Sequence, residues 1–164
     1  MHRIVATLVI AALSGCATIQ DPVPTDYVGP RAWIQDIWSL DADERDQVFA
    51  IAEVDNAAIT NAISETRKAS QGKGFQASQR NYGRAVPARK VKLQIIGTHF
   101  SAAPIGEIAR RAAGTFQSVS GVVELDAREG VNYRVVGELS KVKSCVWIEV
   151  ASTGEPATSK VCST

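Results

Sequence analysis

The spacing of apolar and polar residues predicts a domain built mainly of β-strands. Apolar residues alternate with polar ones over 91–100, as is typical of a strand with one buried face. Runs rich in β-branched and aromatic residues predict strands over 32–40 and 47–54, the second ended by the turn pair Asp55-Asn56. A weak edge strand is expected near Pro87. Four more strands are expected towards the C-terminus, over about 115–126 with a bulge at Gly121, 131–139, 143–151 and 156–162.

Two segments follow the period of an α-helix instead. Apolar and small residues recur at helical spacing over about 60–70, and Gly72 is suited to end that helix. A second helix is expected over 104–113, with Pro104 at its first position and Gly114 just beyond its end. One face of it is apolar and consists of Ile105, Ile108, Ala109 and Ala112.

The order of these elements predicts the fold class. Many short strands follow one another with no regular alternation of strand and helix, which argues against a parallel sheet. We expect a mainly β domain over 31–164, an antiparallel β-sandwich or half-barrel with two short inserted helices.

The first fifteen residues have the pattern of a secretory signal peptide. A basic start is followed by the apolar run 4–13, the small pair Ser14-Gly15 and then Cys16. A membrane-spanning helix needs roughly 20 apolar residues, so this run is too short to be one. The segment 16–30 contains three prolines and no apolar period, which predicts a flexible tether. At roughly 3.3 Å per residue, it could hold the domain a few nanometres from a membrane.

The sequence L-S-G-C at 13–16 resembles the lipobox of bacterial lipoproteins. In that family the signal peptide is cut before the cysteine, and the resemblance implies that Cys16 carries a thioether-linked diacylglycerol and an N-acyl chain. Two or three acyl chains are enough to hold a protein stably on a membrane. The next residue is Ala17 rather than aspartate, which by the same resemblance implies the outer membrane of a Gram-negative bacterium, with the domain facing the periplasm.

A series of motifs in the rest of the chain resembles a group of uncharacterised Gram-negative envelope lipoproteins with a small β-sandwich domain. The motifs are G-P-R-A-W-I-Q-D at 29–36, F-A-I-A-E-V-D-N-A-A-I at 49–59, L-Q-I-I-G-T-H at 93–99, G-V-N-Y-R-V at 130–135 and V-W-I-E-V-A-S-T-G-E-P-A at 146–157. Two turns depart from the family's pattern, since D-N-A replaces I-D-G and Val150 replaces an acid. The resemblance implies no catalytic residues.

Charge is balanced overall but unevenly distributed. Removal of residues 1–15 takes away Arg3 and lowers the formal charge from +1 to 0, which gives no support for nucleic-acid binding. Eight basic residues and no acid lie between positions 67 and 92: Arg67, Lys68, Lys73, Arg80, Arg84, Arg89, Lys90 and Lys92. They are interpreted either as a solvated surface or as a patch that binds an anionic envelope component such as lipid headgroups or peptidoglycan.

Candidate chemistry is sparse. The segment 72–77 matches G-x-G-x-x-A, but it follows a predicted helix rather than a strand, so no dinucleotide or other cofactor is expected. After export, His99 is the only histidine, which serves metal binding poorly. The main interpretation is therefore a binding or accessory module without catalytic activity, with an envelope protein or peptidoglycan as partner. The alternative is a small envelope hydrolase built around His99 and nearby carboxylates.

The remaining cysteines, Cys145 and Cys162, predict a disulfide. They form an even pair in a chain expected in an oxidising compartment. A hairpin that pairs Ala151 with Pro156 also places Cys145 directly opposite Cys162, within the distance range that a disulfide requires.

Overall fold

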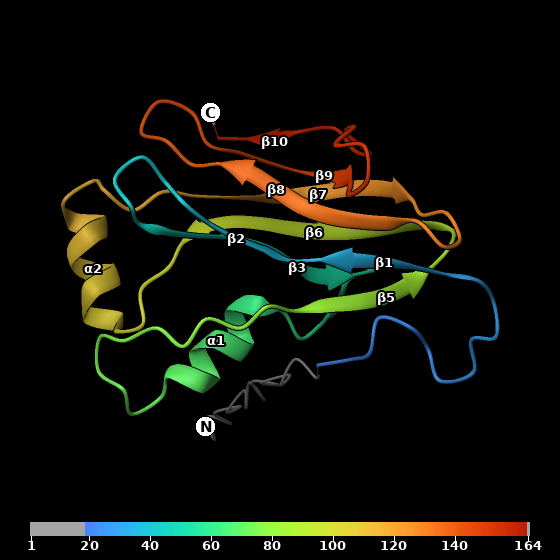
Figure 1. The fold of residues 1–164 in the computed structure, drawn as a ribbon, viewed down its shortest axis with the longest axis horizontal. Helices are drawn as coiled ribbons and strands as arrows, with labels where there is room; N and C mark the ends of the chain where they lie inside the picture. Colours follow the sequence, from blue (N-terminus) through green and yellow to red (C-terminus); the bar gives the residue numbers. More distant parts are fainter. Residues whose placement is uncertain (1–18, 164) are drawn as a thin grey trace, which may run out of the picture.

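Residues 19–163 of the computed structural model form two β-sheets that pack face to face, which is the predicted β-sandwich (Figure 1). The predicted signal peptide and Cys16 lie outside the described residues. The first sheet has the strand order β10-β9-β8-β1-β5. Its strands are β1 (Arg31–Gln35), β5 (Gly83–Pro87), β8 (Asn132–Glu138), β9 (Cys145–Val150) and β10 (Val161–Cys162). Only β1 and β8 run parallel, and the other neighbours are antiparallel.

The second sheet is antiparallel throughout, with the order β2-β3-β6-β7 and the short strand β4 beside β3. Its strands are β2 (Ile37–Leu40), β3 (Asp46–Val54), β4 (Ala57–Ala58), β6 (Lys90–His99) and β7 (Ser118–Asp126). Asp55 and Asn56 both have positive φ, at 50° and 66°, and form the two-residue turn between β3 and β4. This conformation is tolerated best by asparagine, aspartate and glycine, so the predicted turn is confirmed.

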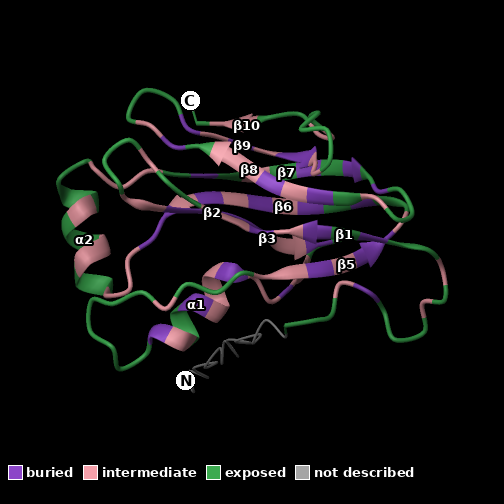
Figure 2. Ribbon diagram, viewed as in Figure 1, coloured by how far each residue is buried: buried purple, intermediate pink, exposed green. Residues whose placement is uncertain are grey.

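Alternating side chains from both sheets fill the space between them. Ile34, Leu93, Ile95, Val135 and Ile148 are all fully buried there (Figure 2). Each such aliphatic side chain contributes about 1.5–3 kcal/mol relative to exposure to water. The alternation in β6 that predicted a half-buried strand therefore reflects one face turned towards this core.

The first strand prediction, 32–40, corresponds to two strands rather than one. The chain passes from the first sheet to the second between β1 and β2, at Asp36. The Asp36 carboxylate is buried at this corner, where it accepts hydrogen bonds from the backbone N–H groups of Ile51 (3.2 Å) and Ala62 (2.8 Å). These bonds satisfy buried polar groups where the strand ladder is interrupted.

Both predicted helices are present. α1 (Ala62–Ser70) begins with a capping box between Asn61 and Ser64. Such a box satisfies backbone N–H groups that the first helical turn leaves free. α2 (Pro104–Ala112) has proline in its first turn, and Gly114 follows it with φ +65°. Among the described residues, no helix is long and apolar enough to cross a membrane.

The apolar face of α2 is turned towards solvent. Ile105 and Ile108 are 67% and 66% exposed, and the helix has no buried residue. It contacts the domain through its other side, where Arg110 Nη1 donates a hydrogen bond to the carbonyl of Phe100 (3.2 Å). Helical spacing correctly grouped the apolar residues, but it carried no information about which side of the helix packs.

Two details of the C-terminal strands differ from expectation. Gly121 makes no bulge, since it pairs with Ile95 in an unbroken register, and the irregularity lies in β3 between Ile51 and Glu53. A Cβ atom at Gly121 would lie 2.6 Å from Val161 in the opposite sheet. Glycine at this position therefore permits the close approach of β7 and β10.

The hairpin between β9 and β10 also departs from the predicted register near its turn. Pro156 bridges to Glu149 rather than to Ala151, and the carbonyl of Glu155 accepts from the backbone N–H of Val150 (2.9 Å). The chain then leaves the ladder until Val161 pairs with Val146. The last strand is therefore much shorter than the predicted 156–162.

The segment expected to be a tether contacts the domain at two points, Gln20 and Val23. The backbone N–H of Gln20 donates to the carbonyl of Ala58 (2.8 Å), and Gln20 bridges to Ile59. Val23 is buried, at 8% exposure. The prolines prevent a regular helix in this segment. They do not prevent its backbone from hydrogen bonding to the domain, or an apolar side chain such as Val23 from being buried against it.

Candidate functional site

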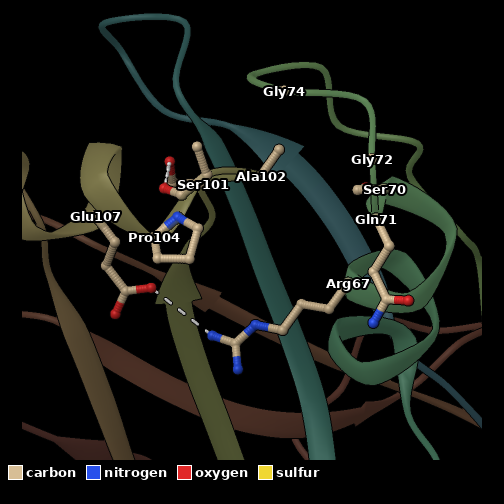
Figure 3. A pocket seen from close by; sticks show the side chains of 10 residues that line it. Arg67, Ser70, Gln71, Gly72, Gly74, Ser101, Ala102, Pro104 and Glu107 are labelled. Carbon is tan, nitrogen blue, oxygen red and sulfur yellow. Dashed lines mark hydrogen bonds and ion pairs between the residues drawn. The ribbon is translucent and has the colours of Figure 1, made fainter.

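A cavity of about 620 Å³ lies between α1, the loop after it and the start of α2. This size is within the range of about 300–1,000 Å³ that is usual for sites of small ligands. The lining residues are Arg67, Ser70, Gln71, Gly72, Gly74, Ser101, Ala102, Ala103, Pro104 and Glu107. Most of them have short side chains, so backbone forms much of the wall (Figure 3).

One cation and one anion face each other across this cavity. Figure 3 shows Arg67 extending from α1 towards Glu107 of α2, with 3.7 Å between Nη2 and Oε2. The other carboxylate oxygen of Glu107 accepts hydrogen bonds from Arg111 Nε (3.1 Å) and Nη2 (2.8 Å). Glu107 is therefore oriented by its own helix, whereas the more exposed Arg67 makes only a long ion pair across the cavity. A ligand carboxylate could replace that weak contact.

The loop that closes one side of the cavity is fixed along α1 by side-chain hydrogen bonds. Ser70 Oγ accepts from the backbone N–H of Ser78 (2.9 Å), and Thr66 Oγ1 accepts from that of Arg80 (2.8 Å). Trp38 Nε1 donates to the carbonyl of Arg80 (3.1 Å). Thr66 and Ser70, which are buried on α1, thus position the loop as well as the helix.

His99, the centre of the hydrolase alternative, is enclosed by protein groups. Its ring is fully buried, Nε2 lies 3.0 Å from Asp41 Oδ2, and Nδ1 accepts from the backbone N–H of Gln117 (3.0 Å). The acceptor role of Nδ1 places the proton of the neutral ring on Nε2, facing Asp41. Both nitrogens are therefore occupied, and His99 lines none of the described cavities.

The pKa values around His99 reflect burial and a nearby arginine. Burial lowers the pKa of His99, as does the charge of Arg45, although Asp41 acts in the opposite direction. Burial alone would raise the pKa of Asp41, but hydrogen bonds from the Arg45 side chain and from backbone N–H groups lower it to about 2. His99 is thus held neutral beside an ionised carboxylate, as expected of a structural contact in the sandwich.

The basic segment does not form one surface patch, and the side chain of Arg84 is buried. Arg84 lies on β5 with its side chain between the sheets, 5% exposed, and its Nη2 is paired with Asp36 Oδ2. The prediction of Arg84 as a surface base is therefore wrong. It rested on sequence proximity to other bases, which does not indicate the side of an edge strand that a residue occupies.

The other seven bases fall into two groups. Arg67, Lys68, Lys73 and Arg80 lie on α1 and the loop after it, at the lower left of Figure 1, whereas Arg89, Lys90 and Lys92 lie around the turn into β6, towards the right. Each base of the second group has a polar partner. Arg89 pairs with Asp55 (2.7 Å), Lys90 with Glu124 (3.8 Å), and Lys92 Nζ donates to Asn56 (3.0 Å).

The structure brings together the two C-terminal cysteines. Cys162 in β10 pairs with Cys145 in β9, and their sulfur atoms form a disulfide. It ties the two-residue strand β10 to the edge of the first sheet. The third candidate, Cys16, lies outside the described residues.

Two features of the molecule were missed by reasoning from the sequence. The buried corner at Asp36 is one, and a lone acid inside an apolar strand run was the available signal. The pairing of Arg67 with Glu107 across the cavity is the other, and no local pattern links these two positions. Within residues 19–163 there is no group of three or more histidine, cysteine or acidic side chains suited to hold a metal ion.

Comparison with known proteins finds no match among family models, curated proteins or solved structures.

Proposed function

We propose that this protein is exported, is anchored by lipid on Cys16 to the outer membrane of a Gram-negative envelope, and acts there as a non-catalytic binding module. The observation that carries the proposal is that two of its three cysteines form a disulfide, while the third directly follows the apolar leader. Cys145 and Cys162 form a disulfide, which persists in oxidising compartments outside the cytoplasm. Cys16 directly follows an apolar leader and the small pair Ser14-Gly15, where lipid attachment requires a free thiol.

The cavity between α1 and α2 supports the binding part of the proposal. Arg67 can pair with a carboxylate, and Glu107 can accept from an ammonium or amide group on the opposite side. Short side chains such as Ser70 and Ala102 leave room for a ligand backbone between them. A peptide group fits this arrangement, as offered by peptidoglycan or by an envelope protein.

Substitution of Cys16 tests the anchoring. Cys16→Ser should abolish acylation and leave the protein soluble in the periplasm or retained as an unprocessed precursor. Cell fractionation and the mass of the N-terminal peptide measure both effects. Ser14→Ala keeps a small residue before the cysteine and should be processed normally. Recovery of processed Cys16→Ser protein with the membranes would contradict lipid anchoring.

A further inference from the structure

The folded domain begins only a few residues after the proposed lipid attachment site. Gln20 is already bonded to Ala58 and bridged to Ile59. An extended chain spans at most about 3.6 Å per residue, so Gln20 can lie no more than about 14 Å from Cys16. A lipid on Cys16 would therefore hold the domain against the bilayer surface, not a few nanometres away from it.

The position of Gln20 also determines which face lies next to the bilayer. Ile59 lies three residues before α1, and the loop after α1 is fixed along the helix through Thr66 and Ser70. Figure 1 shows the start of the described chain, α1 and this loop on the same lower side of the sandwich. We refer to residues 62–80 as the α1 face.

The α1 face is strongly basic. Its bases are Arg67, Lys68, Lys73 and Arg80, all exposed, and its one acid, Glu65, is half-buried. Glu107 of α2 is adjacent but contacts only Arg67 among these bases. Bases next to a bilayer are attracted to anionic headgroups, and each strengthens binding about fivefold.

The same face carries an exposed aromatic side chain. Phe75 is 77% exposed and lies in the loop sequence G-K-G-F, two residues after Lys73. Gly72 and Gly74, with φ +77° and +62°, give the loop its projecting course. Phenylalanine is one of the apolar residues that interfacial segments insert at the boundary between lipid and water, where burial of the ring removes apolar surface from solvent.

We propose that the α1 face docks on an anionic lipid bilayer, with its four bases among the headgroups and Phe75 in the interfacial layer. This inference rests on the lipid anchor proposed at Cys16, because the anchor selects the face that meets the membrane. Docking brings the cavity between α1 and α2 to the membrane surface, since Gly72 and Gly74 form part of its wall.

A second loop provides a matched control. Val142 is 94% exposed between Lys141 and Lys143 in the turn from β8 to β9. That turn lies at the upper left of Figure 1, on the opposite side from α1. Like the loop around Phe75, it presents an exposed apolar side chain close to lysine, but it should remain in water.

The test uses the full lipidated protein in vesicles, with a nitroxide label on Phe75→Cys or on Val142→Cys. The native cysteines are occupied by lipid or by the disulfide, so only the introduced thiol reacts. Oxygen is concentrated in the bilayer, whereas a water-soluble nickel complex stays outside it. The ratio of the label's collision rates with these two reagents therefore measures its depth in the membrane. In vesicles containing phosphatidylglycerol, we expect the label at position 75 to collide more often with oxygen and the label at position 142 to collide more often with the nickel complex.

Charge reversal separates electrostatic docking from simple tethering. Lys68→Glu with Lys73→Glu should lower the ratio of docked to undocked label at position 75 about 25-fold or more, and replacement of phosphatidylglycerol by phosphatidylcholine should also lower this ratio. Lys141→Glu with Lys143→Glu changes the net charge equally and should have no effect.

The outcomes distinguish this inference from the proposed function. If the protein floats with the vesicles but the label at position 75 is as exposed to water as the label at position 142, the proposal of docking is wrong and the proposal of a lipid anchor is retained. Failure to float overturns both. A label that stays aqueous on vesicles but is immobilised by isolated peptidoglycan would assign the α1 face to that polymer and overturn membrane docking.

Discussion

Asp36 and Arg84 form an ion pair buried at the point where the chain passes from one sheet to the other. The two residues are 1% and 5% exposed. Burial raises the pKa of the Asp36 carboxyl, although Arg84 and the backbone donors Ile51 and Ala62 act in the opposite direction. Within the described residues, Nε and Nη1 of Arg84 have no hydrogen-bond partner. The buried guanidinium thus depends on Asp36 for its counter-charge. Through this ion pair and its two backbone hydrogen bonds, Asp36 connects the end of β1 to β3, β5 and α1.

Removal of Asp36 should be strongly destabilising. Asp36→Ala leaves the Arg84 charge buried without a counter-ion, and we expect the free energy of unfolding to fall by about 3–5 kcal/mol, measured by urea denaturation. Arg89→Ala removes an exposed ion pair and should change it by about 1 kcal/mol or less. The double substitution Asp36→Leu with Arg84→Met should lower the free energy of unfolding by less than Asp36→Ala alone. Equal effects of Asp36→Ala and Arg89→Ala would refute a structural role for the buried pair.

The disulfide between Cys145 and Cys162 should stabilise the domain and hold β10 in place. It closes a loop of 17 residues, which corresponds to about 3 kcal/mol in the chain-entropy model. We expect Cys145→Ser with Cys162→Ser to lower the free energy of unfolding by about 2–4 kcal/mol and to speed hydrogen exchange at Val161 and Ser163. Mass spectrometry of non-reduced peptides checks the bond itself. Free thiols at both positions in exported protein would contradict it.

Stability should fall in acid through His99 first and Asp41 second. The folded domain binds a proton at His99 less readily than the unfolded chain does. This contribution is therefore fully present above 6.5, the ordinary pKa of a histidine in an unfolded chain, and is lost as the pH falls below that value. The Asp41 contribution is present above 3.8 and is lost as the pH falls towards about 2.

His99→Gln isolates the first of these effects. We expect unfolding midpoints in urea to decline less between about pH 7 and pH 5 for this variant than for the unaltered protein. Asp41→Asn should flatten the decline below about pH 3.8 instead. Parallel pH profiles for all three proteins would show that neither residue controls stability in acid.

The cavity between α1 and α2 should capture a peptide-containing ligand. A photoreactive amino acid at Gln71, in the cavity wall, should form a crosslink in cells that one at Val142 does not form. Arg67→Glu places a second acid opposite Glu107 and should reduce the Gln71 crosslink about tenfold, as expected for like charges that face one ligand group. Lys141→Glu makes the same change in net charge at a distant turn and should leave the yield unchanged. Equal loss in both variants would argue against a specific contact with Arg67.

Local sequence patterns were enough to predict both helices and most strands of this fold, although the run 32–40 is two strands and the last strand is shorter than predicted. The alternation in β6, the Pro104 start and Gly114 end of α2, and the turn at Asp55-Asn56 all depend on residues within a few positions of one another. Binary patterning acts through backbone geometry, with a period of two in strands and 3.6 in helices, so it can be recognised before any tertiary contact is known. The facing positions of Cys145 and Cys162 followed from the same reasoning, although the register near the turn did not.

Only the tertiary structure decided which faces of these elements are buried and which residues meet. Arg84 is 48 positions from Asp36, and the sequence around it resembles a surface segment rich in bases. The outward apolar face of α2, the packing of Gln20 against Ala58 and the meeting of Arg67 with Glu107 likewise join segments far apart in the chain. Such contacts arise because burial is optimised over the whole domain, and an amphipathic helix or an edge strand offers more than one face to the core. The cavity and the α1 face are products of that long-range packing.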